Sequence, residues 1–238
     1  MNISNIKLPG ARLAAALSYV RKGAVLADIG TDHACLPIYA AQNGLISRAV
    51  ASDVNSGPLV RAIENVKKSG LETLIECVLT SGFDGMEEMG ITDAAICGMG
   101  GELIADIIEN AGFIKHSGMR LIVQPMTMPD AARRAMLRSG FQIVSEMTVA
   151  EDRKYYTVIC ADYCGAEHTI DEFTALFGDF AVKNFESDAV RLGYLRHEIA
   201  KYDRIIKGKS ISGLDTGAER MIIQKLSEKL QEGNVECQ

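Results

Sequence analysis

Carboxylates and glycines stand at the ends of four apolar segments in the first part of the sequence. Asp28 and Asp53 each end one segment, Asp84 follows a third, and residues 98–101 end the fourth with three glycines. A carboxylate can bind a ribose diol or balance a cation, and glycine lets a ligand approach the backbone closely. A single aspartate there can also be a helix N-cap, but three at successive segment ends favour one ligand site.

The segment LADIGTDHACLP, residues 26–37, indicates the kind of ligand. It begins like a nucleotide-binding turn, with Gly30 after an apolar run, but Asp32 and Ala34 stand where a dinucleotide fold has further glycines. An anion at position 32 would repel a pyrophosphate and attract a cation. S-adenosylmethionine carries a sulfonium, an ammonium and no phosphate, so the turn favours this cofactor over NAD.

Two further positions fit a cofactor that contains a nucleoside. Asp53 follows Gly30 by 23 residues, close to the offset at which an acid binds a ribose. The segment CGMGG, residues 97–101, is a poor strand end unless a ligand or acceptor approaches its backbone. A tight turn alone would need only one glycine, so we favour the functional interpretation.

Alternating strands and helices are expected to position these residues. Short apolar runs that end at glycine or aspartate predict the strands, and apolar residues at helical spacing predict the helices. The predicted strands are 24–30, 48–54, 74–82, 93–101 and 119–125, and the predicted helices are 11–21, 36–44, 57–70, 102–112 and 129–140.

The next two strands, 141–150 and 154–163, are separated by only a few residues. Parallel neighbours need a crossover of a dozen or more residues, so these two strands must form an antiparallel hairpin. The predicted fold class is therefore α/β: a Rossmann-like sheet of the S-adenosylmethionine methyltransferase type with one antiparallel strand.

Residues 166–238 follow a different pattern. Helices are predicted over 170–180, 187–208 and 217–233, with apolar residues of the middle helix at three- and four-residue spacing. We expect a methyltransferase domain over 1–165 and a C-terminal helical, coiled-coil-like hairpin domain over 166–238.

Composition limits the remaining possibilities. No apolar run approaches the roughly 20 residues that span a bilayer, and the apolar N-terminal stretch is interrupted by Arg12, so we expect a cytoplasmic protein without a membrane or signal segment. The six cysteines and four histidines are scattered, which favours reduced thiols and no metal site. A net charge of −6 argues against bulk electrostatic binding of nucleic acid but allows a local basic patch.

Several segments in order along the chain resemble the bacterial tRNA adenine-22 N1-methyltransferase family. They are DIGTDHACLP, SGPL, GFDGM, ICGMGGELI, LIVQPM and EDRKYY, and the helical tail is similar to that family's coiled-coil domain. The resemblance implies S-adenosylmethionine as the methyl donor, tRNA as the partner and N1 of adenine 22 as the acceptor. A monomer is favoured.

The resemblance also assigns roles to residues. The cofactor site would contain Asp28, Gly30, Asp32, His33, Asp53, Asp84, Gly85 and Gly98. The expected catalytic positions are Gly98, Met99 and Gly100, together with Asp32, which we expect from the charge of the reaction to stabilise the cationic product. Gly101 would border the target base. Their chemistry and spacing, and not the resemblance, make Arg12, Gln124, Pro125, Tyr155, Arg196, Arg204 and Lys207 further expected substrate contacts. Tyr156 is the alternative to Tyr155, because alternate strand residues point to opposite faces, and among basic residues Lys7, Arg133, Arg134 and Arg138 are further candidates.

Three alternatives stay open at this point. The nearest is an S-adenosylmethionine-dependent methyltransferase that acts on another RNA, a protein or a small molecule. A nicotinamide-dependent oxidoreductase is disfavoured by the glycine-poor turn. A non-enzymatic RNA-binding protein would leave the aspartates at the strand ends without a purpose.

Overall fold

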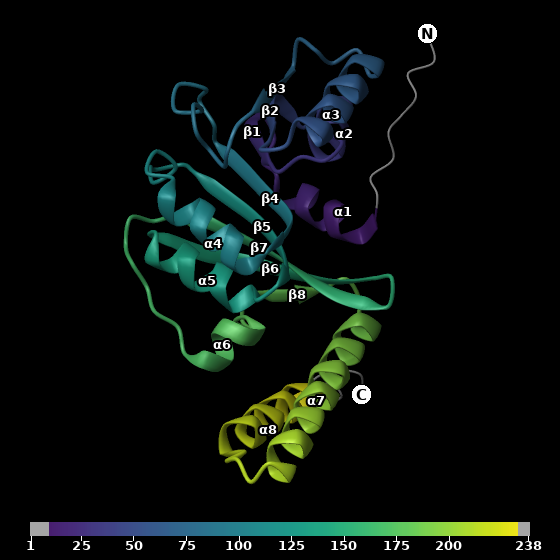
Figure 1. Ribbon diagram of the computed structural model, residues 1–238, viewed down its shortest axis with the longest axis vertical. Coiled ribbons are helices and arrows are strands. Elements are labelled where there is room, and N and C mark those ends of the chain that lie inside the picture. The colour runs from purple at the N-terminus through teal and green to yellow at the C-terminus, as the bar shows by residue number, and fades with distance from the viewer. Residues whose placement is uncertain (1–9, 233–238) are drawn as a thin grey trace. The chain divides into compact units, whose positions relative to one another are not determined.

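The computed structural model describes residues 10–232, and one mixed sheet of eight strands organises most of them (Figure 1). The strand order is β3-β2-β1-β4-β5-β7-β6-β8. The strands are β1 (Ala24–Ile29), β2 (Ile46–Asp53), β3 (Ile75–Leu79), β4 (Asp93–Gly100), β5 (Arg120–Thr127), β6 (Phe141–Glu151), β7 (Lys154–Tyr163) and β8 (Lys183–Phe185). The first five strands run parallel, so their carboxyl ends meet at one edge, and the chain reverses its direction of winding between β1 and β4.

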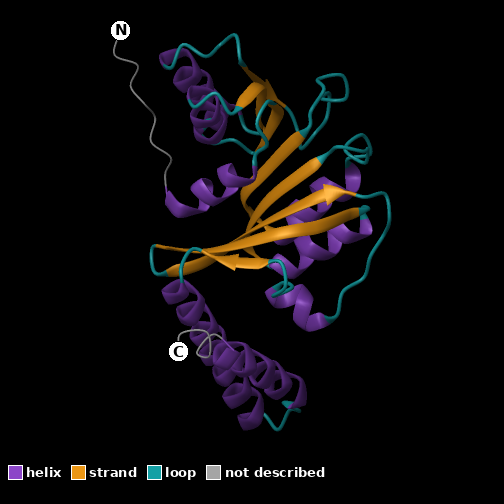
Figure 2. Cartoon of the chain, turned by 180° about the vertical axis from the view of Figure 1, so that it is seen from behind, coloured by secondary structure: helices purple, strands orange, loops and turns teal. Residues whose placement is uncertain are grey.

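Helices cover both faces of this sheet (Figures 1 and 2). The helices α1 (Gly10–Tyr19), α2 (Cys35–Gln42) and α3 (Ser56–Lys68) bury their apolar residues against one face, and α4 (Gly101–Asn110) and α5 (Pro129–Arg138) do so against the other. Because β1, β4 and β5 are covered on both faces, their sequences are almost uninterrupted apolar runs. These runs are the signal from which the strands were predicted.

The predicted antiparallel hairpin is confirmed. β6 pairs with β7 along its length, and β7 also pairs antiparallel with β5, so β7 is the reversed strand of an otherwise parallel set. The turn residues Asp152 and Arg153 both have positive φ, 49° and 62°, which is the backbone of a two-residue hairpin turn. The turn brings Glu151 and Asp152 to the edge where the parallel strands end.

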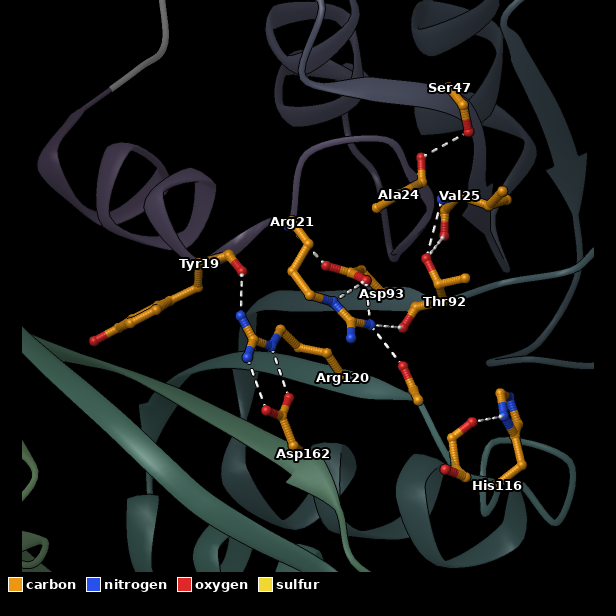
Figure 3. A network of polar contacts seen from close by, with 12 residues as sticks. Tyr19, Arg21, Ala24, Val25, Ser47, Thr92, Asp93, His116, Arg120 and Asp162 are labelled. Atoms are coloured by element: carbon orange, nitrogen blue, oxygen red, sulfur yellow. Dashed lines mark hydrogen bonds and ion pairs between the residues drawn. The ribbon is translucent and has the colours of Figure 1, made fainter.

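A polar network closes the opposite edge of the sheet (Figure 3). Arg21 donates from its main-chain N, Nε and Nη2 to the buried carboxylate of Asp93, at 2.6–2.9 Å. Arg120 forms a two-pronged ion pair with Asp162, at 2.7 and 2.8 Å, and reaches the carbonyl of Tyr19. These contacts attach the end of α1 and the segment before β1 to β4, β5 and β7, so this edge is structural.

A second ionic cluster is fully buried beneath α5. Glu146 on β6 accepts two hydrogen bonds from Arg133, at 2.7 and 2.8 Å, and one from Lys183 on β8, at 3.2 Å. Arg133 also donates to the carbonyl of Ala175, in the helix α6 (Glu172–Phe177). The expectation that Arg133 contacts tRNA is wrong, because its side chain is 1% exposed and is used to join α5, α6 and β6.

The chain divides into two compact units between Asn184 and Phe185. The sequence placed this division at residue 165, but α6 packs on α5 and β8 extends the sheet, so residues 166–184 associate with the first unit. The helix predicted over 170–180 is shortened to α6, because Asp171 caps its start and Gly178, at φ 85°, ends it.

The second unit is a helical hairpin of α7 (Asp188–Ile211) and α8 (Gly217–Glu232). A five-residue connection joins the two helices, and Leu195, Tyr202 and Leu226 are buried between them. The predicted C-terminal helices are therefore confirmed, with boundaries within a few residues of those expected.

Candidate active site

The carboxyl ends of β1 and β4 open into a cavity of about 630 Å³. Its wall combines segments that are far apart in the sequence: the β1–α2 loop, the end of β4, one residue of β5, the start of α1 and the tip of the β6–β7 hairpin. The residues that the later argument uses are Arg12, Asp28, Gly30, Thr31, Asp32, His33, Cys97, Gly98, Gln124 and Glu151.

The β1–α2 loop has a geometry that only small residues permit. Gly30 has φ 73°, a left-handed conformation that favours glycine, and a Cβ built on it would displace the flexible end of the Met99 side chain. Thr31 fixes the next turn, since its hydroxyl accepts from the main-chain N–H of Ala34 at 3.0 Å. Ala34 itself is left-handed, at φ 53°, an uncommon conformation for a residue with a side chain.

Asp28 is the buried carboxylate of the cavity. Asp28 is 7% exposed, and this burial raises the pKa of its carboxyl group to about 6. A hydrogen bond from Thr31 lowers the pKa and the charge of nearby Asp53 raises it, but burial has the largest effect. A carboxylate held in this state is stabilised by an incoming cation. Asp53 is also buried and accepts from the main-chain N–H of Asn55 at 2.7 Å, beside the cavity and not among its lining residues.

Asp32 is partly neutralised by neighbours. Its carboxylate is 61% exposed and pairs with Arg61 of α3 at 2.6 Å and with Nε2 of His33 at 3.1 Å. Asn65 of α3 also donates to the carbonyl of His33, at 3.1 Å, so α3 holds this loop by two side chains. Both Asp32 and His33 face the cavity.

The glycines at the end of β4 serve different purposes. Gly98, at φ 81°, is exposed to the cavity with open space where a Cβ would be, and it lies at a register shift between β4 and β5. A Cβ built on Gly100 would lie 3.4 Å from the Thr127 hydroxyl, an ordinary van der Waals contact, so space does not require a glycine there. A Cβ on Gly101 would lie 1.9 Å from the carbonyl oxygen of Met128, so this glycine is required by packing at the start of α4.

Arg12 enters the cavity from α1 and is held by the hairpin tip. Its main-chain N and Nε donate to the two carboxylate oxygens of Glu151, at 3.0 and 2.8 Å. Nη1 contacts the side-chain oxygen of Gln124 at 3.5 Å and the sulfur of Met126 at 3.2 Å. The guanidinium carbon lies 4.9 Å from the ring centroid of Tyr156.

The neighbouring residues predicted to contact substrate are less accessible. Gln124 and Pro125 are both buried, and the Gln124 amide donates to the Pro125 carbonyl at 3.0 Å. Tyr156 lies behind Arg12, and the alternation along β7 directs Tyr155 to the opposite face of the sheet. Of the two candidate tyrosines, Tyr156 is therefore the one beside Arg12.

Asp84 and Gly85 line or adjoin a different cavity. Asp84 borders a space of about 590 Å³ between the β3–β4 connection and α4, with Leu103, Ile107 and Phe113 in its wall. Gly85 follows it with φ 76°. The structure thus does not bring these two residues into the cavity of Asp28 and Gly98, and their contact with the cofactor stays a prediction.

The three predicted basic residues of the tail lie together on α7. Arg196, Arg204 and Lys207 are exposed, and their spacing places them near one face of the helix. By contrast, the neighbouring Lys201 and Lys209 are engaged with Glu198 and Glu219. In the first unit, Arg134 and Arg138 pair with Glu172 and Glu109, and Lys7 lies outside the described residues.

Sequence reasoning missed three residues that shape the cavity: Thr31, Arg61 and Glu151. Thr31 lies inside the quoted turn and could have been found there. It is a hydroxyl residue directly after Gly30, and such a side chain can accept from the main-chain N–H three residues later. Glu151 lies 139 residues from its partner Arg12, so no local pattern signals this contact.

The cavity lacks the groups of a nucleophilic cysteine enzyme or of a metal site. Burial raises the pKa of Cys97 and of Cys35 above the ordinary thiol value, so both are protonated at neutral pH. Within residues 10–232, no group of three or more His, Cys, Asp or Glu side chains could hold a metal ion. Over the same residues, no helix combines the length and apolar character needed to cross a membrane.

Comparison with known proteins agrees with this arrangement. The family described as "Methyltransferase domain" matches residues 10–159. The tRNA (adenine(22)-N(1))-methyltransferase of Bacillus subtilis (strain 168) is 32% identical over 225 residues, which cover 92% of this chain and 93% of that protein.

Two solved structures are similar over both units. A putative tRNA (m1A22) methyltransferase of Streptococcus pneumoniae, in complex with S-adenosyl-L-methionine, is 31% identical with a TM-score of 0.79, covering 94% of this chain and 100% of that one. M. capricolum TrmK, in complex with S-adenosyl-homocysteine, is 26% identical with a TM-score of 0.76, covering 94% and 99%. With matches of this extent, the chain belongs to the tRNA (adenine(22)-N(1))-methyltransferase family.

Proposed function

We propose that this protein transfers the methyl group of S-adenosylmethionine to N1 of adenine 22 in tRNA. The observation that carries the proposal is the extent of the similarity to the Bacillus subtilis enzyme, which covers 92% of the chain and therefore includes the C-terminal helices. A match limited to the sheet would support the cofactor and the chemistry but not the substrate.

The residues of the cavity fit this cofactor. Asp28 offers a buried carboxylate to a positively charged ligand, and Asp32 places a second carboxylate in the same turn. Gly30 and Gly98 leave the backbone accessible at the ends of β1 and β4. A pyrophosphate would meet two anions here, so the charges disfavour NAD. S-adenosylmethionine, when bound, supplies an electrophilic methyl group on a positively charged sulfur.

Methyl transfer to adenine N1 does not need a general base. Adenine N1 carries a lone pair and no proton, so it can attack a methyl carbon directly, and the charge passes to the methylated base. The chain must therefore align the two partners and tolerate a cation. Asp28 and Asp32 supply negative charge to the cavity, and the protonated thiols of Cys35 and Cys97 do not compete as nucleophiles. We propose that Asp32 stabilises the cationic product, with Arg61 and His33 setting the orientation of its carboxylate.

Binding of the tRNA substrate involves both its target base and its backbone. The target adenine must leave its stack to enter a cavity of this size. The exposed residues Arg196, Arg204 and Lys207 provide positive charge for the tRNA backbone in a chain whose net charge is −6. We also propose that the protein acts in the cytoplasm, where its tRNA substrate is found, and that it is a monomer.

The test is to locate the methyl group. Purified protein is incubated with S-adenosylmethionine and an unmodified tRNA transcript, and reverse transcription is used to detect a stop at nucleotide 22. A transcript with guanine at position 22 is the matched control. A stop at 22 that disappears in the control supports the proposal. Methyl transfer to another nucleotide, or to no tRNA, overturns it.

A further inference from the structure

The Arg12 guanidinium is held in the cavity in one orientation, and this orientation limits what it can bind. Glu151 accepts from Nε at 2.8 Å and from the main-chain N of the same residue at 3.0 Å. Nη1 contacts the Met126 sulfur at 3.2 Å and the Gln124 oxygen at 3.5 Å. The side chain is 26% exposed, so part of it still faces the open cavity.

A phosphate is bound best by two parallel N–H groups along one edge of a guanidinium. One such edge contains Nε, which Glu151 occupies, and the other contains Nη1, which faces Met126 and Gln124. Neither edge of Arg12 therefore presents two nitrogens that are both without a protein contact. The geometry therefore disfavours the role that a basic residue suggests from the sequence, a contact to the tRNA backbone.

The planar faces of the Arg12 guanidinium can make a different kind of contact from its edges. The guanidinium carbon of Arg12 lies over the ring of Tyr156, 4.9 Å from its centroid, so the tyrosine takes up one side of the group. Arg12 lines the cavity and its side chain is 26% exposed, so part of the group is accessible from the cavity. A guanidinium plane stacks well on aromatic rings and on bases.

We propose that Arg12 is the stacking surface for the target adenine, with the guanidinium lying between Tyr156 and the extruded base. This inference rests on the proposed function and adds to it the residue that positions the acceptor. Glu151 acts as a positioning residue, because it fixes the plane of Arg12.

Glu151 has a second effect on the acceptor. Partial burial raises its pKa, but the hydrogen bonds and charge of Arg12 outweigh this and bring the pKa below the ordinary glutamate value. The carboxylate is therefore ionised at neutral pH and offsets the charge of Arg12. A base that becomes a cation on methylation then lies against a neutral ion pair instead of an isolated positive charge.

The test separates stacking from phosphate binding. Arg12→Lys keeps the charge and removes the plane, so we expect kcat for tRNA methylation to fall about 5- to 150-fold, the range for the loss of one stacked base. The Kd for S-adenosylmethionine should not change. The Kd for tRNA and its salt dependence should also remain near those of the unchanged protein, because the base enters the cavity after tRNA has bound. Arg12→Gln should lower kcat at least as much, again with the salt dependence unaltered.

Arg48→Lys is the matched control, since Arg48 is an exposed arginine of β2 that donates to the carbonyl of Met89, away from the cavity. We expect it to keep full kcat. Glu151→Gln leaves Arg12 in place with a weaker anchor, so its kcat should lie between those of the unchanged protein and of Arg12→Lys.

Two results would overturn the inference. One is full kcat in Arg12→Lys. The other is a decrease of about one in the salt slope of tRNA binding in Arg12→Gln, which is the signature of a lost phosphate contact. Both are measured against an unchanged protein that methylates tRNA, whereas failure of the unchanged protein would contradict the proposed function itself.

Discussion

Asp28 shows at the scale of a single residue how this protein exchanges stability for binding. The side chain is buried, and its pKa of about 6 means that the folded protein resists the charged form. Because the folded-state pKa is raised above the ordinary value of 3.8, the stability contributed by this group is present below pH 3.8 and is lost as the pH rises through 6. The ionised form is the one that attracts a cationic cofactor.

Asp28→Asn should therefore have opposite effects on the two properties. At pH 7.5 we expect the free energy of unfolding without cofactor to rise by about 1–3 kcal/mol, and the affinity for S-adenosylmethionine to fall at least tenfold. The affinity of the unchanged protein should also weaken as the pH falls through 6, while that of the variant stays flat. Denaturant unfolding and calorimetric titration at several pH values measure both, with Asp106→Asn as the exposed control. A variant that is less stable at pH 7.5, or that binds the cofactor normally, would contradict this account of Asp28.

The individual residues of the site differ in how far the sequence could identify them. Asp28, Gly30 and Gly98 follow apolar strands, and strands of one parallel sheet bring their carboxyl ends together, so their proximity could be predicted. Gly101 was assigned to the substrate, but the nearby Met128 carbonyl explains why it is a glycine. Glu151 could not be predicted, because its position depends on a long-range packing of α1 against the β6–β7 hairpin.

At the scale of elements, the cluster of Arg133, Glu146 and Lys183 joins α5, β6 and β8. Burial disfavours the charged form of Glu146, but the two cations outweigh burial and hold its pKa below the ordinary value. Its contribution is therefore present above the ordinary pKa of 4.5 and is lost as the pH falls through the lower folded-state value.

Removal of that carboxylate should be costly. Glu146→Gln leaves Arg133 and Lys183 buried without their anion, so we expect the free energy of unfolding to fall by about 3–5 kcal/mol. Glu172→Gln removes the carboxylate of an exposed pair with Arg134 and should change it by about 0.5 kcal/mol or less. Urea unfolding at pH 7.5 compares the two. Equal effects of both substitutions would show that the cluster is not a source of stability.

The elements themselves were largely predictable, and the exceptions have physical causes. Seven strands and the helices between them carry clear periodic patterns, and the short connection at Asp152 forces the hairpin. β8 has only three residues, too few for an alternation, and its place in the sheet is set by contacts with β6 such as the hydrogen bond from Glu146 N to Val182 O. Arg133 has a helical-surface spacing, yet the fold buries it under α6.

At the scale of the whole molecule, the protein combines an acidic chain with a tRNA substrate. Its net charge of −6 gives no general attraction to nucleic acid, so binding must depend on local positive charge. The exposed basic residues of α7 offer such a patch. We therefore expect this patch to determine the affinity for tRNA.

The triple substitution Arg196→Glu, Arg204→Glu and Lys207→Glu should weaken tRNA binding at least tenfold near 0.1 M salt. It should also reduce the salt slope by about two to three and leave the affinity for S-adenosylmethionine unchanged. Reversal of three exposed lysines of the first unit, Lys67, Lys68 and Lys115, is the matched control for net charge. If tRNA affinity in low salt is the same for the unchanged protein and the α7 variant, α7 does not contact tRNA.

The central claim is that the methyl donor binds where β1 and β4 end, and a crystal structure of the protein with S-adenosylmethionine tests it most directly, because the first unit contains two cavities of similar size. The account predicts the methionine end of the donor beside Asp28, Gly30 and Gly98, with the methyl group facing the space next to Arg12. A donor whose methionine end and methyl group lie between Asp84 and Leu103, with the cavity of Asp28 empty, would contradict it.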